Sequence, residues 1–322
     1  MPMFCHYRVC VAPMLNCTDR HYRYLLRQIS RHSYLYTEML MSSALLHGNS
    51  HRYLAFTPLE RPLALQLGGS DPQALARCAR LAQRYGYDEI NLNVGCPSVR
   101  VLAGRFGACL MQTPQRVADC VKAMRDAVNI AVTVKHRTGL GWQNDYARLS
   151  DFVFYLKNAG CERIIVHARN AILQGLSPKQ NRQIPPLRYD DVYRLAKDFP
   201  DLTVILNGGI TTWEAADEHL EHVQGVMLGR MAYNDPYAYA QVDHRYYGDT
   251  RRVPSRAEIV ALMLPYIYHE LAQHTPLSVL LRPLLGLYQG QPGARLWRRL
   301  LSTQANDATI LTSALAQIEA IT

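Results

Sequence analysis

Short apolar segments recur along the first two-thirds of the chain, separated by longer stretches in which polar and apolar residues are mixed. Each segment is continuously apolar instead of alternating with polar residues, a pattern typical of parallel strands that are buried on both faces of a sheet. There are eight such segments, and each has the length of a strand. They are residues 9–13, 34–38, 63–67, 89–93, 131–135, 163–167, 203–207 and 225–229.

The stretches between most of these segments have the periodicity of amphipathic helices. Two of them begin with a helix-start signal, because Asp71 precedes Pro72 and Thr113 precedes Pro114. The stretch after the second segment is a weaker helical pattern, since serine and glycine residues dilute it. The predicted helices are 72–85, 114–128, 146–159, 189–199 and 213–220, with the weak one at 38–48.

Eight strands that alternate with helices predict an α/β fold, a TIM (β/α)8 barrel. An open, doubly wound sheet is the alternative arrangement of the same elements. That fold needs a glycine turn for phosphate after an early strand, and residues 11–15 offer none. The barrel is therefore the favoured interpretation.

The pattern changes after about residue 245. Residues 248–256 have the composition of a linker, and residues 256–273 and 295–319 have helical patterns with no strand between them. We therefore predict a catalytic barrel over residues 1–245 and a small all-helical C-terminal domain over residues 246–322. The second domain carries a dense basic stretch at Arg295, Arg298 and Arg299.

The composition adds a positive charge to this picture. Lys and Arg outnumber Asp and Glu by 35 to 26, which gives a formal net charge of +9. A positive surface attracts polyanions, and nucleic acid is the commonest of them in a cell. A basic enzyme of another kind is an open alternative at this point.

The cysteine pattern and the hydropathy of the chain indicate the cellular compartment in which we expect the protein. The eight cysteines include no CxxC pair and no cluster of zinc ligands, so we expect reduced thiols and no metal site. We find no signal peptide, and no window approaches the roughly 20 apolar residues of a membrane span. We expect a cytoplasmic protein that binds no membrane and has no obligate protein partner.

Polar residues end most of the eight apolar segments. In a barrel these ends meet at the C-terminal face, where catalysis takes place, although strand ends that reach solvent also become polar for that reason alone. The variety of the side chains favours an active site. The residues are Glu38, Gln66, Asn93, Lys135, His167 and Asn207.

Glycines follow the seventh and eighth segments, in the motifs NGGI (207–210) and GR (229–230). Barrels commonly bind phosphate at these two loops through backbone N–H groups. Glycine permits close approach of the backbone, and Arg230 can add a charge-assisted hydrogen bond. A lysine at the mouth, such as Lys135, also requires an anion or an electron-rich ligand to balance it.

Cys96 differs from the other cysteines because it lies in a loop, within the motif NVGCPS after the fourth segment. Gly95 and Pro97 restrict the backbone on either side of it. A loop is where a thiol is least buried and most often functional. The sequence leaves open whether this thiol acts as a nucleophile or as a general acid.

Motifs along essentially the whole chain resemble those of the tRNA-dihydrouridine synthases, and the bacterial A-type subfamily most closely. The long block 87–111, which contains NVGCPS and GRFGACLM, is highly specific. The other matching segments are 12–20, 35–39, 64–72, 132–139, 165–169, 176–187, NGGI, GVMLGR and, in the C-terminal domain, 286–301.

The resemblance implies an enzyme that binds FMN at the barrel mouth, reduces it with NADPH and uses it to reduce uridine in the D-loop of tRNA, at positions 20 and 20a. Hydride would pass from flavin N5 to C6 of uracil, and Cys96 would donate the proton to C5. The implied cofactor-binding residues are Pro13, Met14, Leu15, Gln66, Lys135, His167, Asn207, Gly208, Gly209, Gly229 and Arg230.

By the same resemblance, tRNA would contact the barrel and the helical domain. Two positions depart from the family pattern, because Asn16-Cys17 replaces the usual Asp-Trp and His136 follows Lys135. Two alternatives stay open: an FMN barrel oxidoreductase of the dihydroorotate or enoate type that acts on a small molecule, and a tRNA-binding homologue without activity. The implied tRNA contacts are Asn93, Lys179, Arg182, Arg295 and Arg298.

Overall fold

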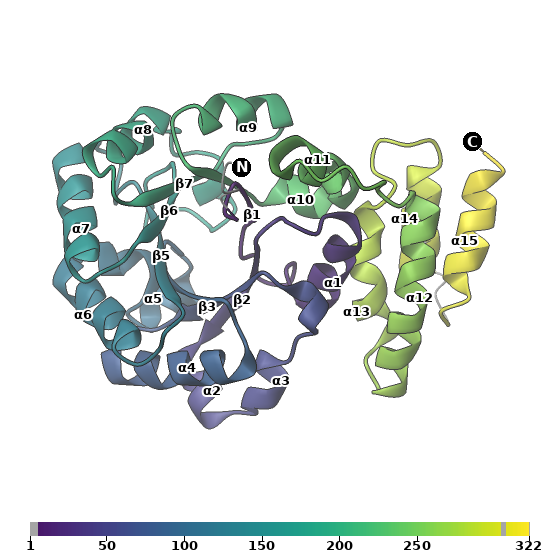
Figure 1. The fold of residues 1–322 in the computed structure, drawn as a ribbon, viewed down its shortest axis with the longest axis horizontal. Helices are drawn as coiled ribbons and strands as arrows, with labels where there is room; N and C mark the ends of the chain where they lie inside the picture. Colours follow the sequence, from purple (N-terminus) through teal and green to yellow (C-terminus); the bar gives the residue numbers. More distant parts are fainter. Residues whose placement is uncertain (1–5, 304–306, 322) are drawn as a thin grey trace.

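The computed structural model describes residues 6–303 and 307–321, and within these ranges eight parallel strands form one sheet that curls into a barrel (Figure 1). The order β1-β8-β7-β6-β5-β4-β3-β2 becomes a ring because Tyr34 exchanges backbone hydrogen bonds with Val9 and Val11. All eight predicted strands are confirmed. They are β1 (Val9–Val11), β2 (Leu35–Met41), β3 (Leu63–Gly68), β4 (Glu89–Val94), β5 (Ala131–Arg137), β6 (Arg163–His167), β7 (Thr203–Asn207) and β8 (Gly225–Leu228).

Helices surround the ring, and the five predicted at 72, 114, 146, 189 and 213 begin at those residues. Asp71 caps the helix after β3 by accepting a hydrogen bond from the backbone N–H of Ala74 at 2.7 Å. The stretch 38–48, predicted as a weak helix, is helical only in its second half. Strand β2 continues to Met41, and a short helix starts after it. The surrounding helices are α1 (Arg20–Ile29), α2 (Ser42–His47), α3 (Ser50–Leu54), α4 (Pro72–Tyr85), α5 (Val99–Ala103), α6 (Pro114–Arg125), α7 (Tyr146–Asn158), α8 (Tyr189–Asp198), α9 (Trp213–Leu220), α10 (Arg230–Asn234) and α11 (Val242–Tyr247).

The chain then leaves the barrel and forms a group of helices beside it, on the side of α1 and α10 (Figure 1). The stretch 295–319, predicted as helical, contains two helices instead of one. Trp297 is fully buried here, packs on Tyr288 and donates its indole N–H to the carbonyl of Leu284 at 2.8 Å. The helices are α12 (Arg256–Ala272), α13 (Leu277–Leu281), α14 (Ala294–Thr303) and α15 (Ile310–Glu319).

The helical group is attached to the barrel through α1. Tyr24 stacks on Tyr266 of α12 at 3.9 Å between ring centroids, and His21 shares a 2.8 Å hydrogen bond with the same tyrosine hydroxyl. Arg282 forms an ion pair with Asp19, whose carboxylate also caps the start of α1. The loop that leads out of β1 therefore contacts both parts of the molecule.

A group of three potential metal ligands lies at the other end of α1, where His32, Asp243 and Asp249 come together. Asp243 accepts hydrogen bonds from the Ser30 hydroxyl and from the backbone N–H groups of Arg31 and His32. His32 contacts Asp249 at 3.0 Å. These bonds tie the C-terminal end of α1 to α11 and the linker, so the group has a structural role.

Side chains of the strands point alternately to the helices and to the barrel interior. The side facing the helices is apolar. The interior is mixed. A small apolar cluster includes Cys10, Tyr36 and Met227 and also takes Ala64 from β3 and Ile165 from β6. The buried polar side chains of the interior come from β3 to β6. Among the described residues, no helix is long and apolar enough to cross a membrane.

We expect Trp297→Ala to lower the free energy of unfolding by about 3–5 kcal/mol, the usual cost of removing a fully buried tryptophan, because the helical group loses its central side chain. Trp142→Ala is the matched control, since Trp142 is 56% exposed, and should change stability by less than about 0.5 kcal/mol. Urea denaturation followed by circular dichroism measures both. Equal losses in the two variants would contradict this account of the helical group.

Candidate active site at the barrel mouth

Cys96 lies in a loop whose backbone is held from several directions. Asn93, at the end of β4, accepts hydrogen bonds through its Oδ1 from the backbone N–H groups of Gly95 at 3.2 Å and Cys96 at 3.0 Å. The carbonyl of Cys96 accepts from the N–H of Ala108 at 3.0 Å. Gly107 has a φ of 73°, and a Cβ there would come within 2.6 Å of that carbonyl. The half-buried thiol is thus presented in one position, with its sulfur 3.5 Å from the Ser98 hydroxyl.

Arg137, the last residue of β5, connects this loop with its neighbours. Its Nε donates to the carbonyl of Gly95 at 3.1 Å, and its Nη1 donates to the carbonyls of Asn170 and Asn181 at 3.3 and 2.9 Å. Arg137 as a whole is 3% exposed, and burial is the main reason why its pKa falls to about 10. One buried cation therefore holds the loops that follow β4 and β6 in a fixed relation.

Lys135 points into the mouth from β5 and donates to the Oδ1 of Asn207 at 2.9 Å. Asn207 is oriented in turn by its own donation to the carbonyl of Met227 at 2.6 Å. Removal of water by the surrounding protein lowers the pKa of Lys135 to about 7, and the charge of Arg137 lowers it further. A nearby ligand with negative charge would favour the protonated ammonium.

The two glycines after β7 have no space for a side chain of their own. Gly208 has a φ of 107°, and a Cβ on it would lie 2.6 Å from the ring of His167. Gly209 has a φ of 78°, and a Cβ there would lie 2.3 Å from the Tyr189 hydroxyl, which donates to the carbonyl of Gly208 at 3.0 Å. Only glycine fits both positions, because His167 and Tyr189 already occupy the space in which a side chain would lie.

The loop after β8 lies beside the loop after β1. A Cβ on Gly229 would be 3.3 Å from the sulfur of Met14, and Gly229 precedes α10, which begins with the exposed Arg230. Pro13 is half-buried, whereas Leu15 is 71% exposed, and no contact in the described part of the chain connects Leu15 to the mouth.

Positive charge is concentrated at the mouth. Burial and the charges of Arg137, Lys135, Arg169 and Arg182 hold the pKa of His167 well below its usual range, which leaves His167 neutral. The pKa of Arg182 is lowered by partial burial and by the charge of Arg230. In the described residues none of the five cations pairs with a carboxylate. Such an arrangement favours an anionic ligand.

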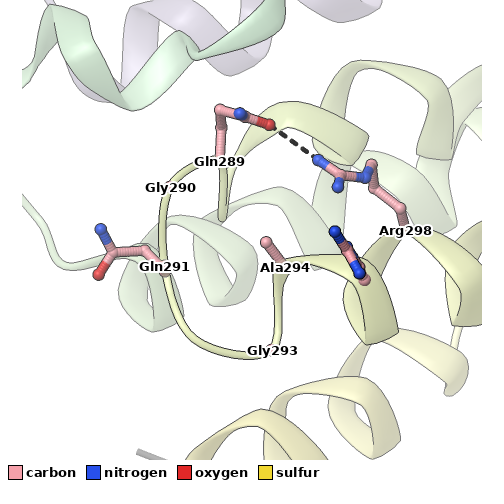
Figure 2. Close-up of a pocket in the computed structure, with 7 residues that line it drawn as sticks. Gln289, Gly290, Gln291, Gly293, Ala294 and Arg298 are labelled. Atoms are coloured by element: carbon pink, nitrogen blue, oxygen red, sulfur yellow. Dashed lines mark hydrogen bonds between the residues drawn. The ribbon is translucent and has the colours of Figure 1, made fainter.

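The five residues predicted to contact RNA fall into two groups. Asn93 lies at the mouth. Lys179 and Arg182 lie in the loop that follows β6, and both reach solvent although the Arg182 side chain is partly covered. Arg295 and Arg298 lie on α14 beside a pocket of about 330 Å³. Figure 2 shows this pocket where the chain turns into α14, with the guanidinium of Arg298 donating to the Gln289 side chain at 2.8 Å.

The two departures from the family pattern have local explanations. Asn16 has a φ of 59°, a left-handed conformation that asparagine and aspartate tolerate better than most residues. His136 is fully buried on the outer side of β5, where its ring packs edge-on against Phe152 of α7. The His136 ring therefore faces α7 instead of the mouth, whereas the backbone N–H of Asn16 donates to the Glu38 carboxylate of β2.

Sequence reasoning missed several residues of this site. Arg137 and Arg169 are buried cations that stand two positions after Lys135 and His167. The available signal was the repeated spacing of a strand-end polar residue and an arginine in VKHR and VHAR. Asn91 and Thr133, which bond to each other at 2.8 Å inside the barrel, gave no signal because polar residues within a buried strand look like interruptions of the apolar pattern.

Comparisons with known proteins add an independent finding. The family model described as dihydrouridine synthase matches residues 10–321. The protein is 58% identical over 304 residues to a Synechocystis protein named tRNA-dihydrouridine(20/20a) synthase, covering 94% of this chain and 90% of that one. Proteins with the same name from Pseudomonas aeruginosa and Escherichia coli K12 are each 56% identical, covering 94% of this chain and 91% and 87% of theirs.

One solved structure, a 2-naphthoyl-CoA reductase complex, matches with a TM-score of 0.54 at 11% identity and covers 73% of this chain. The match spans about half of the reductase, 49% of its length. At this identity the likeness supports the barrel fold alone.

We expect His136 to make stability depend on pH. Burial lowers the pKa of His136 to about 4, so between pH 6.5 and 4 the unfolded chain binds a proton that the folded chain does not, and stability falls as the pH falls. From pH 6.5 to 5 the loss is about 2 kcal/mol. His136→Gln should lose that much less than the wild type when urea unfolding at pH 7.5 and pH 5 is compared. His47→Gln, at an exposed position, should keep the wild-type pH dependence.

Proposed function

This chain belongs to the dihydrouridine synthase family, and on that premise we propose that it is a flavin-dependent tRNA-dihydrouridine(20/20a) synthase. The reaction is reduction of the C5=C6 bond of uracil in the D-loop of tRNA. The single observation that carries the proposal is the position of Cys96, a rigidly held thiol at the mouth of a barrel that is rich in unpaired cations. The 58% identity to a protein of that name supports the same substrate.

We propose FMN as the flavin and NADPH as its reductant. The mouth suits a flavin phosphate, because Gly208 and Gly209 are partly exposed glycines directly after β7 and Arg230 begins the helix after the neighbouring strand β8. When bound, FMN would supply the hydride that passes from N5 to C6 of uracil. Gln66, Lys135 and His167 would contact the flavin, with Asn207, Gly229 and the loop Pro13–Leu15 completing its surroundings.

Cys96 supplies the other hydrogen. Hydride arrival at C6 builds negative charge over C5, C4 and O4 of the ring, and proton transfer from the Cys96 thiol to C5 removes that charge. Lys135 and Arg137 both lie near enough to Cys96 that a thiolate there would raise their pKa values. These two cations therefore lie close enough to the thiol to interact with negative charge that develops at this side of the mouth.

The uracil reaches the mouth only after it leaves its stack, which costs roughly a few kcal/mol and least in an unpaired loop. Cationic side chains outside the mouth would supply the binding energy. Lys179 and Arg182 lie in the loop after β6, and Arg295 and Arg298 would extend the contact to the helical group formed by α12 to α15. We propose a cytoplasmic location, where tRNA and NADPH are both present.

Two observations separate this proposal from its alternatives. A barrel oxidoreductase for a small molecule has no use for the basic pocket on α14. A tRNA-binding homologue without activity has no use for a loop in which Gly107, Ala108 and Arg137 hold Cys96 in one position.

We expect Cys96→Ala to slow uridine reduction roughly 10²- to 10⁴-fold, the range of general-acid catalysis. The measurement is the dihydrouridine content of unmodified tRNA after incubation with the protein and NADPH. Cys109→Ala is the matched control, because its half-buried thiol contacts only the Phe106 carbonyl at 3.2 Å in the described part of the chain. The proposed function is wrong if the flavin-loaded wild type leaves the tRNA unchanged.

We expect the double variant Arg295→Ala/Arg298→Ala to weaken tRNA binding. The slope of log K against log salt should become shallower by about one to two, because fewer phosphate contacts form and fewer counterions are released on binding. Filter binding at several salt concentrations measures both quantities. The rate of flavin reduction by NADPH alone should not change. Arg148→Ala removes an exposed arginine from α7, and an equal loss of affinity in that variant would point to net charge instead of these two positions.

A further inference from the structure

The loop that joins β5 to α7, called the β5 loop below, is held by hydrogen bonds to the loop that follows β6. The Nδ2 of Asn170 donates to the carbonyls of Gly141 and Gln143 at 3.0 and 2.8 Å. The Oδ1 of the same side chain accepts from the Thr138 hydroxyl at 2.8 Å. The backbone N–H of Gly141 also donates to the carbonyl of Ala171 at 2.9 Å. The backbone of the β5 loop is therefore fixed over most of its length.

Trp142 lies between the two carbonyls that Asn170 holds. Its own carbonyl accepts a hydrogen bond from the Nη2 of Arg188 at 3.2 Å, so the backbone is anchored at this residue too. The side chain is 56% exposed, and in the part of the chain that the structure describes its ring has no aromatic partner and its Nε1 no acceptor. The indole groups of Trp213 and Trp297, by contrast, are buried, and each donates to a carbonyl.

The β5 loop is on the same face of the barrel as the candidate active site, because loops that follow the strands of a barrel gather at its C-terminal face. Arg137, at the end of β5, donates to the carbonyls of Asn170 and of Gly95, the residue before Cys96. One buried guanidinium thus connects the anchor of Trp142 with the loop of the thiol. A base that enters the mouth leaves the neighbouring nucleotides of its strand over the surrounding loops.

Cations lie in the loop after β6, to which the β5 loop is bound. Arg188 bonds to the backbone of Trp142. Lys179 and Arg182 lie on either side of Asn181, whose carbonyl accepts from the same guanidinium that holds the β5 loop and the loop of the thiol. Within residues 6–303 and 307–321, none of these three cations forms an ion pair with a carboxylate. The strand of an RNA has phosphates to pair with them.

The acidic groups near the β5 loop are already engaged. Asp145 caps the start of α7 and pairs with Arg148, and Asp191 of α8 accepts a hydrogen bond at 3.4 Å from the amide of Asn144. The two residues after Trp142 are exposed and polar, so the ring is not part of a continuous apolar strip along the loop. A protein interface needs a large contiguous surface, whereas a nucleobase needs only one ring face to stack on.

We propose that Trp142 stacks on an unpaired nucleobase of the tRNA D-loop, next to the uridine that enters the mouth. Every base has a π face, so this contact tolerates any base, while the cations of the β6 loop meet the phosphates. The inference deepens the proposed function, from which it takes the tRNA substrate. The indole contributes to binding and takes no part in the transfer of hydride or proton. Its fixed backbone reduces the ordering cost of the contact.

Tryptophan fluorescence tests the contact directly, because Trp142 is the exposed one of three tryptophans. Unmodified tRNA is titrated into the flavin-loaded protein, and we expect the tryptophan emission to fall with saturation. Trp142→Phe keeps an aromatic ring and both buried tryptophans, so it should bind tRNA without this fall in emission. Equal quenching in Trp142→Phe would contradict the proposal.

The affinity for tRNA provides the second measurement. Trp142→Leu removes the π face and leaves an apolar side chain, and we expect it to raise the Kd for tRNA about five- to a hundredfold, while Trp142→Phe stays within about threefold of wild type. The slope of log K against log salt should not change, because an indole carries no charge. Phe154→Leu, at an exposed aromatic residue of α7, is the matched control and should bind tRNA as the wild type does.

Two further measurements separate stacking from other causes. At saturating tRNA, Trp142→Leu should reduce uridine at the wild-type rate, so KM rises and kcat does not fall. A set of tRNAs, each with one abasic nucleotide in the D-loop, identifies the partner base. One of them should bind the wild type as weakly as intact tRNA binds Trp142→Leu, and combining the two changes should cause little further loss.

The outcomes distinguish this inference from the proposed function. A wild type that binds tRNA with quenching of Trp142 but reduces no uridine overturns the proposed activity and leaves the contact standing. An active wild type with unchanged affinity in Trp142→Leu overturns the contact alone. An equal loss in Phe154→Leu, a shallower salt slope in Trp142→Leu, or a change in emission that follows protein concentration instead of tRNA also overturns it. These results would indicate a general surface effect, a displaced Arg188 or self-association.

Discussion

A carboxylate buried inside the barrel, that of Glu89, is the constraint on which the interior depends. A charge without water is very costly unless every bonding position is occupied. Arg163 pairs with Glu89, and the hydroxyls of Tyr36 and Thr133 donate to it at 3.0 and 2.5 Å. Burial raises the pKa of Glu89, while Arg163 and these donors oppose that rise.

The hydrogen bonds of each buried polar group in the interior determine those of its neighbour. Arg163 is covered by the ring of Tyr7, 3.0 Å from the centroid, which closes the barrel below the ion pair. Above the pair, the hydroxyl oxygen of Thr133 accepts a hydrogen bond from Asn91, and Asn91 accepts one from Gln66 in turn. Replacing one member with an apolar residue would leave a neighbour with an unmade bond, which costs about 1–3 kcal/mol. The barrel interior is consequently a single polar unit that reaches the functional loop.

The mouth carries the opposite kind of constraint. Burial lowers the pKa of Lys135, Arg137 and Arg182, and repulsion between neighbouring cations lowers it further. Such an arrangement is unfavourable in the isolated protein and becomes favourable when an anion binds. The helical group extends the same charge through α14, and its attachment at α1 places it beside the loop that leads from β1 into the mouth. Stability of the free protein and affinity for a polyanion are thus set by the same side chains.

The sequence alone determined the barrel, because continuous apolar segments at regular spacing have few other ways to be buried. It also located Cys96, Lys135 and the glycines of the last two loops, since strand ends of a barrel meet at one face. The tertiary structure decided the rest. Whether Arg137 is a solvated strand-end residue or a buried connection between loops depends on the carbonyls of Gly95, Asn170 and Asn181, which come from distant parts of the chain. The orientation of Asn93 depends on Glu89, Thr133 and Gln66 in the same way. Hydrogen-bond direction is a property of partners in space, and a linear pattern of polar residues does not contain it.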